Sequence, residues 1–227
     1  MKLLDSKLLK GKKVNILGDS ITVGAGASDP NNKYINVFKK ISGADLEVNG
    51  IGGTRIAIQH NPSTSSDPVF NKYFASRIDE MRKDADYVVV FGGTNDFGHG
   101  DAPFGKFGDK SSETFYGALY ELYSKLYETY PTSRIIVITP LHRENEDDTV
   151  NEIGLPCHVL KDYVDAIKDM ASYFSIPVLD LYSNANMTAK VKIANKALFY
   201  DGLHPTDLGH RRIAESLYKF IINNFLV

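Results

Sequence analysis

The stretch Val14-Asn15-Ile16-Leu17-Gly18-Asp19-Ser20 joins a short apolar run to a glycine turn and a serine. The run is nearly continuous in its apolar character, as expected for a parallel strand that is covered on both faces. Three further runs of this kind follow at residues 87–91, 134–138 and 177–181, and a weaker one lies at 46–48. The sequence therefore predicts a parallel sheet of about five strands.

Amphipathic patterns separate these apolar runs. Apolar residues recur at three- and four-residue steps over residues 115–126 and 160–174, and over 213–221 after Pro205, which suits a first helical turn. Strands that alternate with helices form βαβ units with right-handed crossovers. We therefore expect one α/β domain over residues 1–227, built as a three-layer α/β/α sandwich.

The composition narrows the class of protein. The chain has 227 residues and a formal net charge of -2, and no basic block marks it as a nucleic-acid partner. The single cysteine, Cys157, allows no intramolecular disulfide, so nothing calls for an oxidising compartment. The stretch Met1–Lys7 lacks the apolar run of a signal peptide, and no stretch approaches a membrane span of ~18 apolar residues. The expected location is the cytoplasm, and the oligomeric state stays open.

Four short motifs carry the candidate chemistry. They are Gly18-Asp19-Ser20, Asn49-Gly50-Ile51-Gly52-Gly53, Gly93-Thr94-Asn95-Asp96 and Asp201-Gly202-Leu203-His204-Pro205. The first three each follow an expected strand. Because the carboxyl ends of parallel strands share one edge of the sheet, where ligands bind in such folds, we expect these motifs to meet at a site.

The residue types in these motifs are those that acyl transfer to water requires. Ser20 can attack a carbonyl if a base removes its proton, and His204 can act as that base while Asp201 orients its ring. The backbone N–H groups of Ser20 and Gly53 and the Asn95 amide can stabilise an oxyanion. Each motif alone also fits a structural role, with Ser20 as a helix N-cap, Gly53 as a turn residue and Asn95 in an Asx turn.

In this order, the four motifs resemble the sequence blocks of the SGNH hydrolases, the GDSL-type esterases and lipases. The resemblance extends from Gly18 to Pro205, and the last two blocks match fully. The first block is followed by Ile21-Thr22 instead of the frequent leucine, and in the looser second block Gly53 aligns better than its neighbouring glycines. The resemblance implies a flavodoxin-like sheet, a catalytic triad of Ser20, Asp201 and His204, and an oxyanion hole of Ser20, Gly53 and Asn95.

We therefore expect a serine ester hydrolase that needs no cofactor and no metal. The histidines show no metal-ligand spacing, and the acid–histidine cluster at Asp96–Asp101 carries little support for a metal. The loops at the expected rim of the site are polar, with Arg55, His60, Asn61 and Arg143 among their residues. This polarity favours a short acyl group, such as acetyl, on a polar or carbohydrate alcohol as the small-molecule substrate.

Other functions fit the same motifs. One alternative is a lipase- or thioesterase-type acylhydrolase that acts on a lipid or a thioester. Another is a ligand-binding module that keeps the fold without turnover. A flavodoxin-like nucleotide or flavin binder, with residues 18–26 as a phosphate loop, belongs to a third class.

Overall fold

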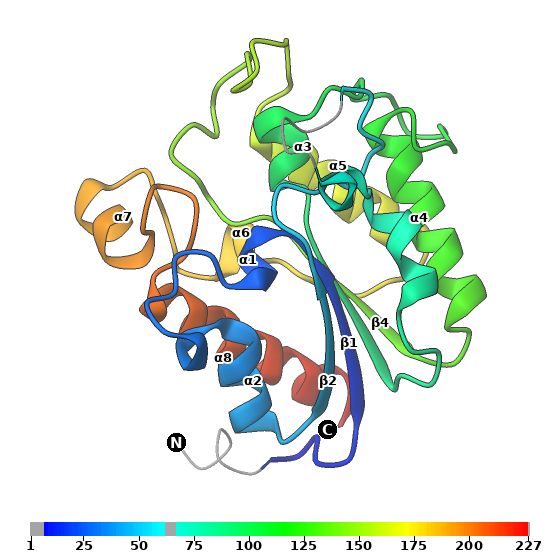
Figure 1. Cartoon of the computed structure of the whole chain (residues 1–227), viewed down its shortest axis with the longest axis vertical. Helices are drawn as coiled ribbons and strands as arrows, with labels where there is room; N and C mark the ends of the chain where they lie inside the picture. The colour runs from blue at the N-terminus through cyan, green and yellow to red at the C-terminus, as the bar shows by residue number, and fades with distance from the viewer. Residues whose placement is uncertain (1–6, 62–66, 227) are drawn as a thin grey trace.

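The computed structural model describes residues 7–61 and 67–226. Its sheet has five parallel strands in the order β2-β1-β3-β4-β5 (Figure 1). The strands are β1 (Lys13–Gly18), β2 (Asp45–Gly50), β3 (Tyr87–Phe91), β4 (Arg134–Ile138) and β5 (Val178–Leu179). This is the strand order of flavodoxin-like folds, so the expected fold class is confirmed.

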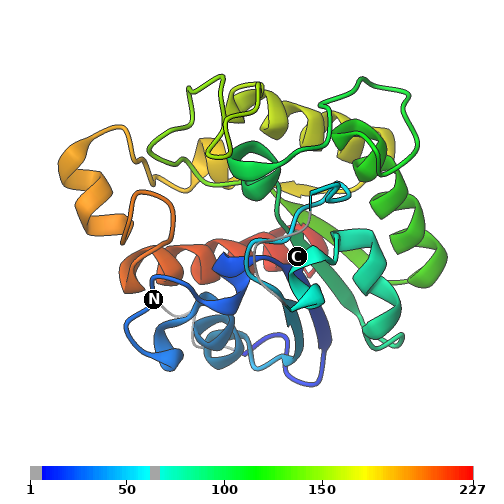
Figure 2. The same cartoon turned by 45° about the horizontal axis from the view of Figure 1, so that its top comes forward.

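Helices cover both faces of the sheet, which gives three layers (Figures 1 and 2). On one face lie α4 (Phe115–Thr129), α5 (Leu160–Tyr173) and the 3₁₀ helix η3 (Phe74–Glu80); on the other lie α2 (Tyr34–Ser42) and α8 (Asp207–Phe225). Side chains of β3 alternate between the two cores, because Val88 and Val90 pack in the first and Val89 and Phe91 in the second. The near-continuous apolar runs of the sequence thus reflect burial on both faces.

Shorter elements complete the fold. They are α1 (Ser20–Val23), η1 (Pro30–Asn32), η2 (Pro68–Asn71), α3 (Thr94–His99), α6 (Leu181–Asn184) and α7 (Lys192–Leu198). Both α1 and α3 begin just beyond the carboxyl ends of strands, β1 and β3 respectively. In the described part of the chain, no helix combines the length and the apolar character needed to span a bilayer.

Some local expectations differ from the structure. The apolar run at 177–181 forms a strand of only two residues, because the Asp180 side chain accepts the Ser183 N–H at 3.0 Å and caps α6. Pro205 lies before α8 and not in its first turn, because Thr206 is the N-cap of that helix. The stretch Met1–Lys7, in which no signal peptide was expected, lies mostly outside the described residues.

Candidate active site

The turn that carries Ser20 lies at the carboxyl end of β1, where the chain passes directly into α1. No side chain fits at Gly18, because a Cβ there would lie 2.0 Å from Oγ1 of Thr22. Asp19 is the N-cap of α1, since its carboxylate accepts the Ile21 N–H at 2.9 Å. Ser20 is therefore not the cap of this helix, and its hydroxyl is available for another partner.

That partner is His204, which lies in the loop before α8. Ser20 Oγ lies 3.0 Å from His204 Nε2, and His204 Nδ1 lies 2.7 Å from Asp201 Oδ2. With a proton on Nδ1, the ring donates to the carboxylate and accepts from the serine hydroxyl. The fold thus brings together the three residue types that act as nucleophile, base and orienting acid in acyl transfer.

The Asp201 carboxylate is held by its own turn. Gly202 has a φ of +84°, and Asp201 Oδ1 accepts the N–H groups of Leu203 at 3.1 Å and His204 at 2.8 Å. Partial burial by itself raises the pKa of Asp201, but hydrogen bonds from the ring and backbone of His204 outweigh it, and the pKa lies below its ordinary value. Asp201 is therefore ionised at neutral pH and can stabilise a protonated imidazole.

The two remaining candidate oxyanion donors lie on segments that hydrogen-bond to each other. Asn95 lies in the first turn of α3, and its Nδ2 donates to the backbone oxygen of Thr54 at 2.9 Å. Gly53 directly precedes Thr54. It has a φ of +73°, and a Cβ there would meet no heavy atom within 4 Å. The bond to Thr54 orients the Asn95 amide beside the Gly53 turn and uses one of its two Nδ2 hydrogens, which leaves the other for a ligand.

Two buried carboxylates lie next to the candidate catalytic residues. Asp96 accepts the N–H groups of Ile56 at 3.0 Å and Ala57 at 2.9 Å, and so holds the segment after Gly53 against α3. Burial raises the pKa of both Asp96 and Asp19 to about 6, although backbone hydrogen bonds oppose this shift. Asp96 was expected within the Gly93–Asp96 motif and an acid–histidine cluster, with no structural role; its place directly after Asn95 was the available signal for that role.

A cavity of about 550 Å³ lies beside the Gly52–Gly53 turn. Its wall combines polar and apolar side chains: Arg55, Gln59, Asn61, Phe70, His99, Asp101, Ile153 and Leu155. Burial and the nearby Arg55 charge lower the pKa of His99, so this imidazole is neutral at pH 7 and can both donate and accept. The cavity can therefore hold a group with hydroxyls and an apolar face.

Three buried arginines anchor the segments around the site. Arg77 donates to the backbone oxygen of Gly18, Arg143 to that of Thr94 and Arg55 to that of His99. Each is at most 4% exposed. Arg55 and Arg143 were expected on the polar rim, and Arg77 was not singled out at all, because arginine is mostly exposed and no local pattern marks a buried one.

The loop after β4 connects the two halves of the site. Arg143 Nη1 donates to the Thr94 oxygen at 3.2 Å, next to Asn95, and the following residue, Glu144, donates its N–H to the Gly202 oxygen at 2.9 Å. Further along this loop are apolar residues of the cavity wall. Adjacent residues therefore contact the helix that carries Asn95 and the loop that carries Asp201 and His204.

The chain is similar to known proteins in sequence and in fold. The model of the GDSL-like lipase/acylhydrolase family matches residues 16–212. Among solved structures, a protein from Lactobacillus plantarum is 32% identical, with 95% of this chain and 98% of that chain covered and a TM-score of 0.79. A search of curated proteins gave no match.

Two more distant structures share the fold. A possible lipase from Chitinophaga pinensis is 23% identical, with 95% of this chain and 99% of that chain covered and a TM-score of 0.72. An acetyl xylan esterase, AlAXEase, is 22% identical, with 92% of this chain and 100% of that chain covered and a TM-score of 0.62. Since the family model spans most of its length, this chain belongs to the GDSL-like lipase/acylhydrolase family.

Proposed function

We propose that this chain is a serine ester hydrolase in which Ser20 is the nucleophile. The observation that carries the proposal is the continuous line of contacts from Ser20 Oγ to His204 Nε2, at 3.0 Å, and from His204 Nδ1 to Asp201, at 2.7 Å. Membership of a lipase/acylhydrolase family supports the same reaction class. The proposed roles are those of nucleophile, general base and orienting acid.

The reaction proceeds through an acyl-enzyme. Ser20 Oγ forms a bond to the ester carbonyl carbon while His204 Nε2 takes the hydroxyl proton. The resulting oxyanion accepts hydrogen bonds from the N–H groups of Ser20 and Gly53 and from Asn95 Nδ2. When the bond to the leaving oxygen breaks, His204 returns the proton to that oxygen, and the alcohol departs. A water molecule then attacks the acyl-enzyme in the same way and restores Ser20.

The proposed substrate is a short acyl group, such as acetyl, on a polar or carbohydrate alcohol. Polar side chains on the cavity wall support it, because Gln59, Asn61 and His99 can hydrogen-bond to hydroxyls. The structural neighbour named an acetyl xylan esterase agrees with this substrate class. Sugar rings also present C–H faces, which suit an apolar side chain such as Phe70 on the same wall.

A second candidate is an acylhydrolase for longer acyl chains on lipids or thioesters. It is favoured by Ile153 and Leu155, which line the cavity and are 51% and 38% exposed. A series of p-nitrophenyl esters of increasing acyl length separates the two candidates. We expect the highest kcat/KM for acetate; a preference for long chains would select the second candidate.

Covalent labelling tests the reaction class directly. A fluorophosphonate probe should modify Ser20 in the folded protein, and peptide mapping should recover the adduct on the peptide that contains this residue. Failure to label folded protein would contradict the esterase proposal and favour a binding module of the same fold.

A further inference from the structure

Arg77, in η3, joins the carboxyl ends of β1 and β2. Its Nη1 and Nη2 each donate to the backbone oxygen of Gly18 at 3.1 Å, and Nη1 also lies 3.3 Å from the backbone oxygen and 3.1 Å from Oδ1 of Asn49. Gly18 stands two residues before Ser20, and Asn49 stands four residues before Gly53. One guanidinium therefore contacts the two strand ends that lead to the proposed nucleophile and to a proposed oxyanion donor.

The environment of Arg77 is unfavourable for a charge. The side chain is 0% exposed, and burial lowers its pKa to about 10. Among residues 7–61 and 67–226 no carboxylate lies within ion-pair distance of it, although the charges of Asp19 and Glu80 oppose the shift from farther away, and its Nε has no hydrogen-bond partner. Its guanidinium carbon lies 4.6 Å from the centre of the Phe74 ring, which compensates only in part. Burial of a charge without an ion pair is not a general route to stability, so another role is indicated.

We propose that Arg77 is a positioning residue of the ester-hydrolysis site. By holding the ends of β1 and β2 in one register, it makes the Ser20 turn and the Gly53 turn face the same substrate carbonyl. This inference rests on the proposed function, because it gives Ser20 and Gly53 the roles described there. Arginine suits the task since its planar fork can contact several acceptors at once, whereas a lysine ammonium is a single point charge.

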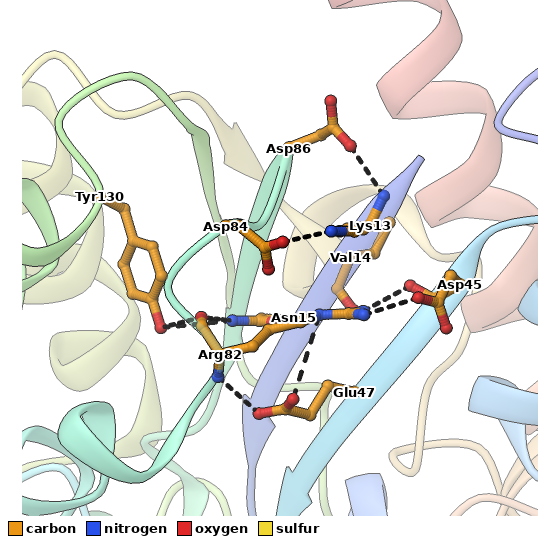
Figure 3. Close-up of polar contacts among 9 residues, drawn as sticks. All are labelled: Lys13, Val14, Asn15, Asp45, Glu47, Arg82, Asp84, Asp86 and Tyr130. Atoms are coloured by element: carbon orange, nitrogen blue, oxygen red, sulfur yellow. Dashed lines mark hydrogen bonds and ion pairs between the residues drawn. The ribbon is translucent and has the colours of Figure 1, made fainter. Parts of the chain in front are cut away.

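Arg82 provides a matched control within the same two strands. It joins their amino ends, where its Nη2 donates to the backbone oxygens of Asp45 at 2.6 Å and Val14 at 3.3 Å (Figure 3). Its Nε also donates to Oδ1 of Asn15 at 2.9 Å. Arg82 thus makes the same kind of contact to the same strands, at the end that is remote from Ser20.

The experiment compares Arg77→Lys with Arg82→Lys in the full chain. For each variant, kcat and KM for p-nitrophenyl acetate, the rate of fluorophosphonate labelling and Tm are measured, with assays well below the lower Tm. We expect Arg77→Lys to lower kcat and the labelling rate by about 10-fold to 100-fold, with KM nearly unchanged, because misplacement of reacting groups by about 1 Å has effects of this size. Arg82→Lys should lower Tm and leave kcat unchanged.

Specific outcomes overturn the inference. If folded Arg77→Lys has the kcat and labelling rate of Arg82→Lys, Arg77 has no positioning role. If Arg77→Lys does not fold, Asn49→Ala takes its place, because it removes the Oδ1 acceptor of Arg77 and keeps the backbone acceptors. A several-fold lower kcat supports the inference, and an unchanged kcat overturns it. A wild-type chain without turnover or Ser20 labelling overturns the proposed function together with this inference, whereas an active wild type with an equally active Arg77→Lys overturns the inference alone.

Discussion

The paired strands β1 and β2 are linked to each other by one arginine at each end. The two arginines lie in opposite environments. At the carboxyl ends, Arg77 is buried and donates its hydrogen bonds to backbone and amide oxygens. At the amino ends, Arg82 is 19% exposed and forms an ion pair with Asp45 (Figure 3). One end satisfies its charges in contact with water, whereas the other keeps a charge without an ion pair next to the proposed nucleophile.

The carboxylates at the two ends of these strands also differ, because the pKa is raised at the carboxyl ends and lowered at the amino ends. Burial raises the pKa of Asp19, next to Ser20, to about 6. Burial alone would also raise the pKa of Asp86 at the amino ends, but hydrogen bonds from Lys13 and Lys12 outweigh it and lower the pKa. Contacts at the amino ends therefore stabilise the sheet, while the carboxyl ends hold groups in positions that burial makes unfavourable. Such a difference is typical of functional sites.

The largest expected effect is the loss of the nucleophile. Ser20→Ala should lower kcat by about 10⁴-fold or more, because the acyl-enzyme can no longer form, and should leave the fold intact. Ser133→Ala is the control, since its Oγ donates to the Ala85 oxygen at 2.6 Å before β4. It should change Tm slightly and leave kcat unchanged. Ester hydrolysis at wild-type rate by Ser20→Ala would remove Ser20 from the mechanism.

The next largest expected effect is the loss of kcat on substitution of Asn95, with a second buried asparagine, Asn15, as the control. Asn95→Ala should lower kcat by about 10²–10³-fold through the loss of one oxyanion donor. Asn15→Ala removes hydrogen bonds to the Arg82 oxygen and to Tyr130, so the free energy of unfolding should fall by about 1–3 kcal/mol without a change in kcat. Steady-state kinetics and urea unfolding of both variants make the comparison. Similar kcat values for the two would exclude Asn95 from catalysis.

A smaller effect is expected from two glycines with positive φ. A Cβ at Gly26 would lie 2.3 Å from the Pro205 oxygen and 3.1 Å from the His204 Cβ, so Gly26→Ala should displace His204 and lower kcat by roughly 10-fold. A Cβ at Gly11 would meet nothing within 4 Å. Gly11→Ala should therefore show only the strain of a left-handed backbone, about 1–2 kcal/mol, with unchanged kcat. Equal kcat values would argue against contact-driven displacement of His204.

The smallest expected effect is on how the free energy of unfolding depends on pH. The pKa of Asp19 in the folded protein lies above its ordinary 3.8, so its contribution to stability is fully present in acid. This contribution is lost as pH rises to about 6, and the free energy of unfolding falls by about 1–3 kcal/mol. Asp86 acts in the opposite direction, since its lowered pKa stabilises the fold above pH 4 and this contribution is lost in stronger acid. Urea unfolding over pH 3–8 should show that Asp19→Asn reduces the fall in stability between pH 4 and 6, where buried Asp96 also contributes, and that Asp86→Asn reduces the loss in stronger acid, where other carboxylates with lowered pKa, such as Asp201, also contribute. Parallel curves for Asp19→Asn and wild type between pH 4 and 6 would contradict the assignment.

The sheet and the meeting of the motifs could be predicted from the sequence. Parallel strands place their carboxyl ends at one edge, so Ser20 and Asn95 had to lie near each other once their strands were identified. The short β5 was not predicted, because the apolar run at 177–181 hides the tendency of Asp180 to cap a helix. Local side-chain hydrogen bonds of this kind compete with strand pairing.

The anchoring arginines could not be predicted in the same way. Arg77 lies 59 residues from Gly18 and 28 from Asn49, and nothing near it in the sequence marks it as buried. Its role depends on a three-dimensional crossing of η3 with two strand ends, which has no periodic or motif signature.

The loop after β4 has a consequence for divergence among related enzymes. Residues 143 and 144 fasten its beginning to the Asn95 helix and to the Asp201 turn, while Ile153 and Leu155 near its far end line the cavity beside the Gly52–Gly53 turn. Insertions or deletions between these two parts would remodel this cavity and leave the proposed catalytic residues where they are. Substrate range and chemical step can therefore evolve separately on this scaffold.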